Sequence, residues 1–239
     1  MELSEKEVTR ISETVEMIPQ DVDSILEVGC GDGRVSKFIR RNSKLTGIDI
    51  DSIRIKTFSG NRIIADISEL PIRNCTFDLV LSTEVLEHLN DETFYFATSE
   101  ISRVAKKYIL ITVPFEETLS AEWVKCSKCS HIFHAWGHVR RFNLEILKKL
   151  FDGAALIKKR FLGPKETRVP SFCYVIAKKL GNVWGGNHEN PPLCPKCGSK
   201  PVKCEGNIFG KIFIRLIWRV NKVSPFKKPI WVASLYQKS

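Results

Sequence analysis

The chain has 239 residues, of which 43% are hydrophobic, and a formal net charge of +10. Such a chain can bury one sizeable core, so we expect one domain with an elaboration. It contains no apolar run of about 18 residues and begins with the polar sequence Met-Glu-Leu-Ser-Glu-Lys, which argues against a transmembrane helix and a signal peptide and predicts a soluble, cytoplasmic protein.

The positive charge is concentrated in the second half of the chain. Residues 1–122 carry 14 Lys/Arg and 22 Asp/Glu, a balance of −8, whereas residues 123–239 carry 23 Lys/Arg and 5 Asp/Glu, a balance of +18. An anionic partner is therefore to be sought in the second half.

The first elements in chain order are a helix and a strand followed by glycines. Apolar residues at three- and four-residue spacing predict an amphipathic helix over 3–18. Residues 24–33 read Ser-Ile-Leu-Glu-Val-Gly-Cys-Gly-Asp-Gly, a short apolar run and three alternating glycines. This pattern predicts a buried parallel strand, a tight turn that lets a ligand approach the backbone, and a helix over 34–41 with free N–H groups at its start.

Further apolar runs predict an alternating order of strands and helices. Strands are expected over 45–51, 62–65, 77–82, 107–113 and 155–162, with helices over 93–104 and 143–150. Because the order up to residue 113 is β-α-β with short loops, we expect an α/β fold with a doubly wound parallel sheet. Residues 171–179 and 229–237 compete for the last strand, and we favour 229–237.

The segment from Glu27 to Gly33 resembles motif I of the class I S-adenosylmethionine-dependent methyltransferases. A dinucleotide fingerprint would require its third glycine at the position of Arg34. The resemblance covers about residues 22–162 and implies a Rossmann-like, seven-stranded methyltransferase sheet with an antiparallel hairpin at its end, to which this chain adds a zinc-binding insertion.

The resemblance also implies a binding site for S-adenosylmethionine at the carboxyl ends of the first strands. Asp49 would accept hydrogen bonds from the ribose, whereas Asp51 could merely cap the next helix. Asp66 would bind the adenine amino group, with Ile67 covering the ring. The implied cofactor-binding residues are Glu27, Gly29, Cys30, Gly31, Gly33, Asp49, Ile50, Asp66, Ile67, Ser82 and Glu84.

Two Cys-x-x-Cys pairs predict a structural zinc site. Two residues between cysteines allow both thiolates to reach one tetrahedral ion, and the pairs Cys126/Cys129 and Cys194/Cys197 together would supply four ligands. A local site of two cysteines with His134 and His138 is the alternative, and Cys204 is a spare thiol.

Three histidines are candidates for a catalytic base. His88 follows the fourth strand, and a helical turn there would direct it to the same side as Glu84. His134 and His138 precede Phe142, and in related methyltransferases a His-x-x-x-Phe segment at this point often approaches the substrate. Each histidine could equally be structural.

The expected core comprises residues 1–162 and 229–239, including a loop over 114–142 that carries the first cysteine pair. Residues 163–228 form the expected insertion with the second pair. Within it, residues 208–223 predict an amphipathic helix with a basic stripe, which could contact an anionic membrane or a lipid-linked substrate, or simply pack on the core.

The sequence thus predicts a methyltransferase that acts on an oxygen, nitrogen or carbon atom of a small-molecule or lipid- or glycan-linked acceptor. The basic second half leaves an RNA or DNA methyltransferase as an alternative, although the Ser-Thr-Glu-Val sequence after the fourth strand lacks the usual element for a flipped base. A non-catalytic, zinc-bearing interaction module is the other alternative. The sequence leaves the oligomeric state open.

Overall fold

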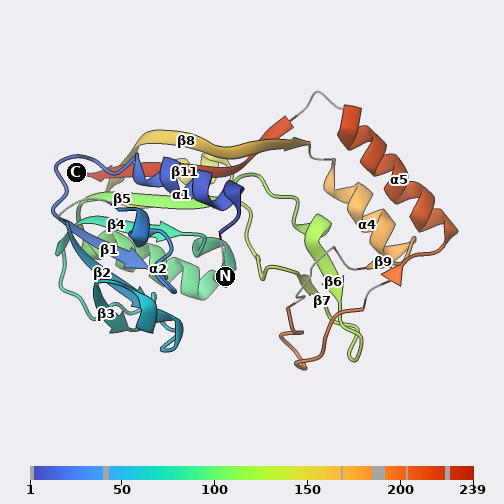
Figure 1. Cartoon of the computed structure of the whole chain (residues 1–239), viewed down its shortest axis with the longest axis horizontal. Coiled ribbons are helices and arrows are strands. Elements are labelled where there is room, and N and C mark those ends of the chain that lie inside the picture. Colours follow the sequence, from blue (N-terminus) through green and yellow to red (C-terminus); the bar gives the residue numbers. More distant parts are fainter. Residues whose placement is uncertain (1–2, 40–42, 168, 185–191, 203, 224–226) are drawn as a thin grey trace. The chain divides into compact units, whose positions relative to one another are not determined.

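The computed structural model describes residues 3–39, 43–167, 169–184, 192–202, 204–223 and 227–239 (Figure 1). The chain divides into two compact units. Unit 1 comprises Met1–Glu116, Phe142–Pro164 and Pro229–Ser239, and unit 2 comprises Glu117–Arg141 and Lys165–Lys228. The loop over 117–141, which the sequence analysis assigned to the core, therefore lies in unit 2.

Unit 1 is built on a seven-stranded sheet of order β3-β2-β1-β4-β5-β11-β8. Strands β3, β2, β1, β4 and β5 are parallel, and β11 runs antiparallel to β5 with Val232 opposite Val113. The strands are β1 (Ser24–Val28), β2 (Lys44–Asp49), β3 (Asn61–Ile64), β4 (Phe77–Thr83), β5 (Ala105–Pro114), β8 (Ala154–Thr167) and β11 (Lys227–Lys238). The predicted α/β fold with a seven-stranded sheet is confirmed, and the last strand is the C-terminal segment, because residues 171–179 form a helix.

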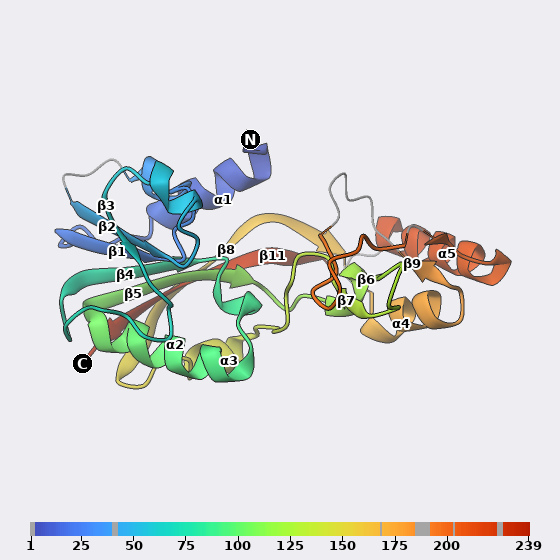
Figure 2. The same cartoon turned by 90° about the horizontal axis from the view of Figure 1, so that it is seen from below.

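Among the described residues of unit 1, three α-helices cover the sheet, and side chains cap the start of each. Helix α1 (Glu5–Val15) begins with a capping box between Ser4 and Glu7. Asn90 caps α2 (Asp91–Val104), and Asn143 caps α3 (Leu144–Lys148). Helix α1 lies on one face of the sheet, and α2 and α3 lie on the other (Figure 2).

Alternation along the central strands fills both faces of this sheet. In β4, Val80 belongs to the apolar cluster that includes Ile101 of α2, whereas Leu79 and Leu81 belong to the cluster that includes Ile11 of α1. All five side chains are almost fully buried. A strand buried on both faces reads as a continuous apolar run, which is why the sequence revealed these strands.

The helix expected over 34–41 is not formed. Turns follow the glycines, and the regular structure there is a short 3₁₀ helix, η1 (Ser36–Phe38), which has no side-chain cap. Phe38 and Ile39 donate to carbonyls three residues back, those of Val35 and Ser36, whereas the bond from Lys37 N–H to the Gly33 carbonyl has α-helical spacing. Residues 40–42 lie outside the described part of the chain.

Three further 3₁₀ helices occur in the described residues: η2 (Arg54–Thr57) and η3 (Leu86–His88) in unit 1, and η4 (Leu119–Glu122) in unit 2.

The described part of unit 2 contains short strands and two α-helices besides η4. An antiparallel hairpin of β6 (Trp123–Lys125) and β7 (Ile132–His134) carries the first cysteine pair in its loop, and β9 (Val183–Trp184) pairs with β10 (Cys204–Glu205). Helices α4 (Ser171–Lys179) and α5 (Ile208–Val223) pack together. Among the described residues of the whole chain, none of the helices combines the length and apolar character that crossing a bilayer requires.

Candidate functional site

The glycine loop follows β1 at the carboxyl edge of the sheet in unit 1. Gly29, Gly31 and Gly33 all have positive φ, at 68°, 50° and 72°. A Cβ on Gly29 would collide with the Val85 side chain, and one on Gly33 would stand 2.9 Å from Phe58 Cδ2. Conformation and space therefore both require glycine, because protein side chains already fill the space that a Cβ would occupy.

Asp49, at the end of β2, ties this loop to the neighbouring strand. Its Oδ2 accepts a hydrogen bond of 2.7 Å from Gly31 N–H, and its Oδ1 accepts one of 2.8 Å from Asp51 N–H. Each carboxylate oxygen has a second lone pair, so the half-buried carboxylate can still accept from ribose hydroxyls. Asp51 accepts from the N–H groups of Ile53 and Arg54, which is the capping role expected for it.

Two buried polar side chains beside the loop have an atom that lacks a hydrogen-bond partner among the described residues. They are Glu27 of β1, at Oε2, and Ser82 of β4, at Oγ. Burial raises the pKa of Glu27 to about 8. Because buried polar atoms are nearly always paired, these two fit a site that receives a polar or cationic ligand group.

The remaining expected cofactor contacts flank the same edge. Ile50 is 71% exposed directly after Asp49, so its side chain is accessible to a ligand at this edge. Asp66 follows β3 and uses Oδ1 to accept from Ser68 N–H and Oγ–H, which lower its pKa. Cys30 differs, because its side chain is buried in a cluster with Ile55 and Phe58. Its expected contact with the cofactor would therefore involve its backbone.

Glu84 lies at the end of β4 in a network that the sequence did not reveal. Its φ is 55°, and its Oε2 accepts a 2.8 Å hydrogen bond from Trp231 Nε1. Its Oε1 accepts one of 3.3 Å from Thr112 Oγ1 and lies 3.6 Å from Arg10 Nη1. The Arg10 guanidinium also stands over the Trp231 ring, 5.4 Å from its centroid. The Glu84 carboxylate thus contacts side chains from three elements, α1, β5 and β11.

His88 is the last residue of η3, and its side chain is exposed. The helical turn expected to include both Glu84 and His88 begins only at Leu86. Glu84 lies outside it with a left-handed backbone conformation, so the expected i, i+4 relation between the two side chains does not hold.

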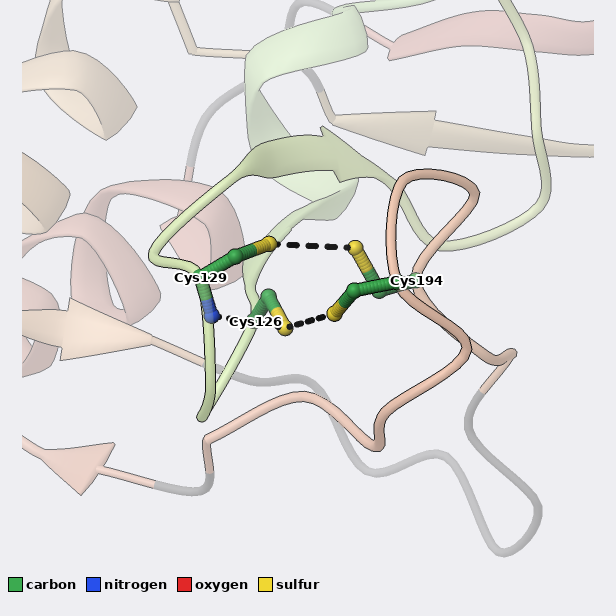
Figure 3. A group of neighbouring side chains, drawn as sticks. Cys126, Cys129 and Cys194 are labelled. Carbon is green, nitrogen blue, oxygen red and sulfur yellow. Dashed lines mark hydrogen bonds between the residues drawn. The ribbon is translucent and has the colours of Figure 1, made fainter.

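In unit 2 the two cysteine pairs come together. The Sγ atoms of Cys126, Cys129, Cys194 and Cys197 all lie within 4.8 Å of one another, and Figure 3 shows the three labelled cysteines turned toward a common centre. The distance is 3.4 Å from Cys126 to Cys197 and 3.7 Å from Cys129 to Cys194. These are too long for disulfides and close to the separation of about 3.8 Å between sulfurs around tetrahedral zinc.

Backbone hydrogen bonds hold the two cysteine-bearing segments in place. Cys126 Sγ accepts from the N–H groups of Lys128 and Cys129 at 3.4 Å. Val202 N–H donates to the Lys125 carbonyl at 2.6 Å, and Ser127 N–H donates to the Lys200 carbonyl at 3.1 Å. Such N–H to sulfur bonds orient thiolate ligands around a metal.

Glu117 joins the two histidines of unit 2. Its Oε2 lies 2.7 Å from His138 Nδ1, and its Oε1 lies 3.5 Å from His134 Nε2. Burial raises the pKa of Glu117, but the hydrogen bonds from both histidines outweigh this and lower it to about 2. The two imidazoles stack, with centroids 4.7 Å apart. The histidines thus bind a carboxylate in a cluster separate from the four cysteines.

The protonation pattern of these histidines follows from their neighbours. His134 Nδ1 accepts from the N–H groups of Trp136 and His138, each at 3.2 Å, so its proton is on Nε2. Since Glu117 is ionised and can only accept, His138 donates to it from Nδ1.

Sequence reasoning missed Arg10, Thr112, Trp231 and Glu117 as partners of site residues. Trp231 is 147 residues from Glu84 in sequence, and no local pattern reports such a pairing. Glu117 lies in an irregular stretch directly after Glu116, and neither residue belongs to a recognisable motif. The described residues also leave the side chain of Cys204 unplaced.

Comparison with known proteins finds matches to the central part of unit 1. Residues 26–110 match the family model described as a methyltransferase domain. A methyltransferase of Mycobacterium tuberculosis of uncharacterized function is 29% identical over 138 residues, which cover 51% of this chain and 69% of that protein. An uncharacterized protein of Methanocaldococcus jannaschii is 28% identical over 134 residues, which cover 54% of this chain and 57% of that protein.

A solved structure supports the same fold. The S-adenosylmethionine-dependent methyltransferase of Archaeoglobus fulgidus superposes with a TM-score of 0.55 at 18% identity, covering 92% of this chain and 87% of that one. At this identity the likeness concerns the fold. The two sequence relatives each align with about half of this chain.

Proposed function

We propose that this chain, whose unit 1 is a class I S-adenosylmethionine-dependent methyltransferase domain, methylates an oxygen, nitrogen or carbon nucleophile of a small-molecule or lipid- or glycan-linked acceptor. The observation that carries the cofactor site is the group of features at one sheet edge: the glycine loop with its three positive φ angles, the Asp49 carboxylate, and the buried Glu27 with an unpartnered oxygen. Together these groups match a ligand that consists of an amino acid joined to a nucleoside, because they provide carboxylate acceptors for its ammonium group and its ribose hydroxyls.

Each end of the cofactor would have its own residues. Glu27 would accept from the ammonium group, Gly29–Gly33 would approach the methionine part, Asp49 would accept from the ribose, and Asp66 with Ile67 would hold adenine. S-adenosylmethionine itself supplies a methyl group on a sulfonium, with its leaving group built in. The protein is then left with two tasks, which are alignment of the acceptor and removal of its proton.

We propose His88 and His138 as the candidates for the residue that accepts this proton. His138 is supported by the Glu117 carboxylate, which fixes its tautomer as in other carboxylate–histidine pairs. Because His134 Nδ1 accepts two backbone hydrogen bonds and its Nε2 lies 3.5 Å from Glu117 Oε1, we assign His134 to positioning of Glu117 and His138. The expected results are loss of turnover in His138→Ala with retained cofactor binding, and a smaller loss in His88→Ala.

Calorimetric titration with S-adenosylmethionine tests the cofactor site. Micromolar binding is expected for the wild-type chain, with loss in Gly31→Arg and at least about tenfold weakening in Asp49→Ala. The matched control is Asp51→Asn, which keeps the oxygen that caps η2 and is expected to bind normally. Absence of wild-type binding in a correctly folded, metal-loaded sample would favour the non-catalytic module.

The acceptor class is tested with a labelled methyl donor. The protein is incubated with S-adenosylmethionine labelled in the methyl group and with separate pools of polar metabolites, extracted lipids and purified tRNA. Label in the metabolite or lipid pool supports the proposal. Label in tRNA alone would instead establish the nucleic-acid enzyme that the basic second half allows.

We further propose that the four cysteines of unit 2 bind one structural Zn²⁺. The proposal is supported by the sulfur separations and by the hydrogen bonds to Cys126. With four protein ligands the site is closed, so its role is structural.

A further inference from the structure

Helices α4 and α5 of unit 2 form a packed pair with a small core of their own. Val169, Ala177 and Ile217 are buried between them, and Figure 1 shows the two helices side by side. Asn207 fixes their connection, because its N–H donates to the Gly181 carbonyl at 2.9 Å and its Oδ1 caps α5 through Gly210 N–H at 2.8 Å. The orientation of α5 on α4 is therefore defined.

A second apolar face of α5 is left exposed. Five large aliphatic or aromatic side chains on this helix are between 50% and 79% exposed, and we call them the apolar face: Ile208, Phe209, Ile212, Leu216 and Val220. Their spacing of three and four residues puts them on one side of the helix, adjacent to the side that carries buried Ile217. Contiguous exposed apolar surface of this kind indicates an interaction site.

A basic stripe runs along the other edge of the apolar face. It consists of four exposed cationic residues, also at three- and four-residue spacing: Lys211, Arg215, Arg219 and Lys222. The sequence of α5 contains no acidic residue. Unit 2 as a whole has 17 Lys/Arg and 5 Asp/Glu, a net charge of +12.

We propose that the apolar face and basic stripe of α5 form a docking surface for an anionic lipid bilayer. A helix that lies in the bilayer interface buries its apolar side among the acyl chains and keeps its cations at the level of the headgroups. The two faces of α5 meet along the helix as this geometry requires, and the basic residues complement anionic headgroups. Helix α5, at 16 residues, would lie along the surface.

The exposed side chains favour a bilayer over the other possible occupants. Nucleic acid is held by cations and by stacking on aromatic rings, and it makes no use of exposed Ile212, Leu216 and Val220. A second copy of this chain, if paired through the same face, would bring two basic stripes together without an acidic counterpart on the helix.

Vesicle flotation tests the proposal with the full-length protein. Phosphatidylcholine vesicles with and without phosphatidylglycerol serve as probes. Binding is expected with phosphatidylglycerol, and it should weaken at high salt. The double variant Ile212→Ser/Leu216→Ser should lose binding by about tenfold or more. Arg215→Gln/Arg219→Gln should weaken it about fivefold for each charge removed.

The matched control is Ile157→Ser, which removes an equally exposed aliphatic side chain (49%) from β8 in unit 1 and should bind vesicles as the wild type does. Zinc content and the far-ultraviolet circular dichroism spectrum verify that each variant is folded. Absence of binding to phosphatidylglycerol vesicles, or equal binding by the Ile212/Leu216 variant, would overturn the proposal. A tRNA complex that needs only the arginines, or a dimer dissociated by the serine substitutions, would reassign the surface to those partners. All of these outcomes are independent of cofactor binding.

Discussion

Unit 1 and unit 2 are stabilised in different ways. Unit 1 has a sheet with apolar clusters on both faces, in which residues such as Leu26 and Leu79 are fully buried. In unit 2, the cluster between α4 and α5 has three buried residues, and the cysteine-bearing segments are joined by backbone hydrogen bonds and four converging thiols. A small unit with a limited core gains most from a metal or another cross-link.

The two units also differ in charge. Unit 1 has 20 Lys/Arg and 22 Asp/Glu, a net charge of −2, against +12 for unit 2. The acids of unit 1 include Glu27, Asp49 and Asp66 at the edge where a cationic sulfonium and ammonium group would bind. The two regions thus suit opposite tasks: unit 1 suits a small cationic cofactor, and unit 2 suits an anionic surface.

The largest expected difference between the two units concerns the proposed metal, whose loss should affect unit 2 and leave unit 1 unchanged. In Cys126→Ser/Cys194→Ser, zinc should be lost and the β6–β7 region of unit 2 should unfold, because bound zinc contributes directly to folding free energy in small domains. Cofactor binding by unit 1 should persist. Zinc analysis, limited proteolysis and calorimetry measure the three effects. Unchanged protease resistance of residues 117–141 in the metal-free variant would contradict the structural role.

A core truncation should affect unit 1 alone. Leu26→Ala removes a fully buried side chain from the cluster beneath α2 and is expected to cost about 2–5 kcal/mol of unfolding free energy. Leu216→Ala, the same substitution at a half-exposed position of α5, should change it by less than about 0.5 kcal/mol. Urea unfolding followed by circular dichroism measures both. Equal losses of unfolding free energy in the two variants would contradict the difference in packing between Leu26 and Leu216.

The buried carboxyl of Glu27 should make unit 1 sensitive to pH. Because burial raises its pKa from 4.5 to about 8, the folded chain holds a proton that the unfolded chain releases, and stability should fall as pH rises through this window. An ammonium group beside Glu27 favours the ionised form, so cofactor affinity should rise with pH up to about 8, at most about tenfold per unit.

Glu27→Gln is the control for this prediction, since it keeps the shape and removes the titration. Calorimetry in buffers of different ionisation enthalpy should detect proton release on binding to the wild-type chain and none with the variant. Identical proton release by both chains would assign the titration to another group.

The smallest expected effect concerns the start of α5. Asn207→Ala removes the cap on Gly210 and the hydrogen bond to the Leu180 carbonyl, and it should cost about 1 kcal/mol of local stability in unit 2. Amide hydrogen exchange of α5 should accelerate while that of β4 stays unchanged. Faster exchange in both elements would show that the two units unfold together.

Much of unit 1 could be predicted from the sequence. Its strands are buried on both faces, so they appear as unbroken apolar runs, and positive φ at Gly29, Gly31 and Gly33 requires the residue that the sequence shows there. The helix over 34–41 was wrong, because apolar periodicity records which residues face the core and does not require that the backbone completes α-helical turns.

The sequence by itself determined where the strands of unit 1 follow one another along the chain, where the glycine loop lies, how the cysteine pairs are spaced and that α5 is amphipathic. Each of these is a local pattern of residue types. Only the tertiary structure decided that residues 117–141 join unit 2, that Glu117 binds both His134 and His138, and that Arg10 and Trp231 meet at Glu84. These contacts depend on chain topology, which brings together residues that no short-range pattern relates.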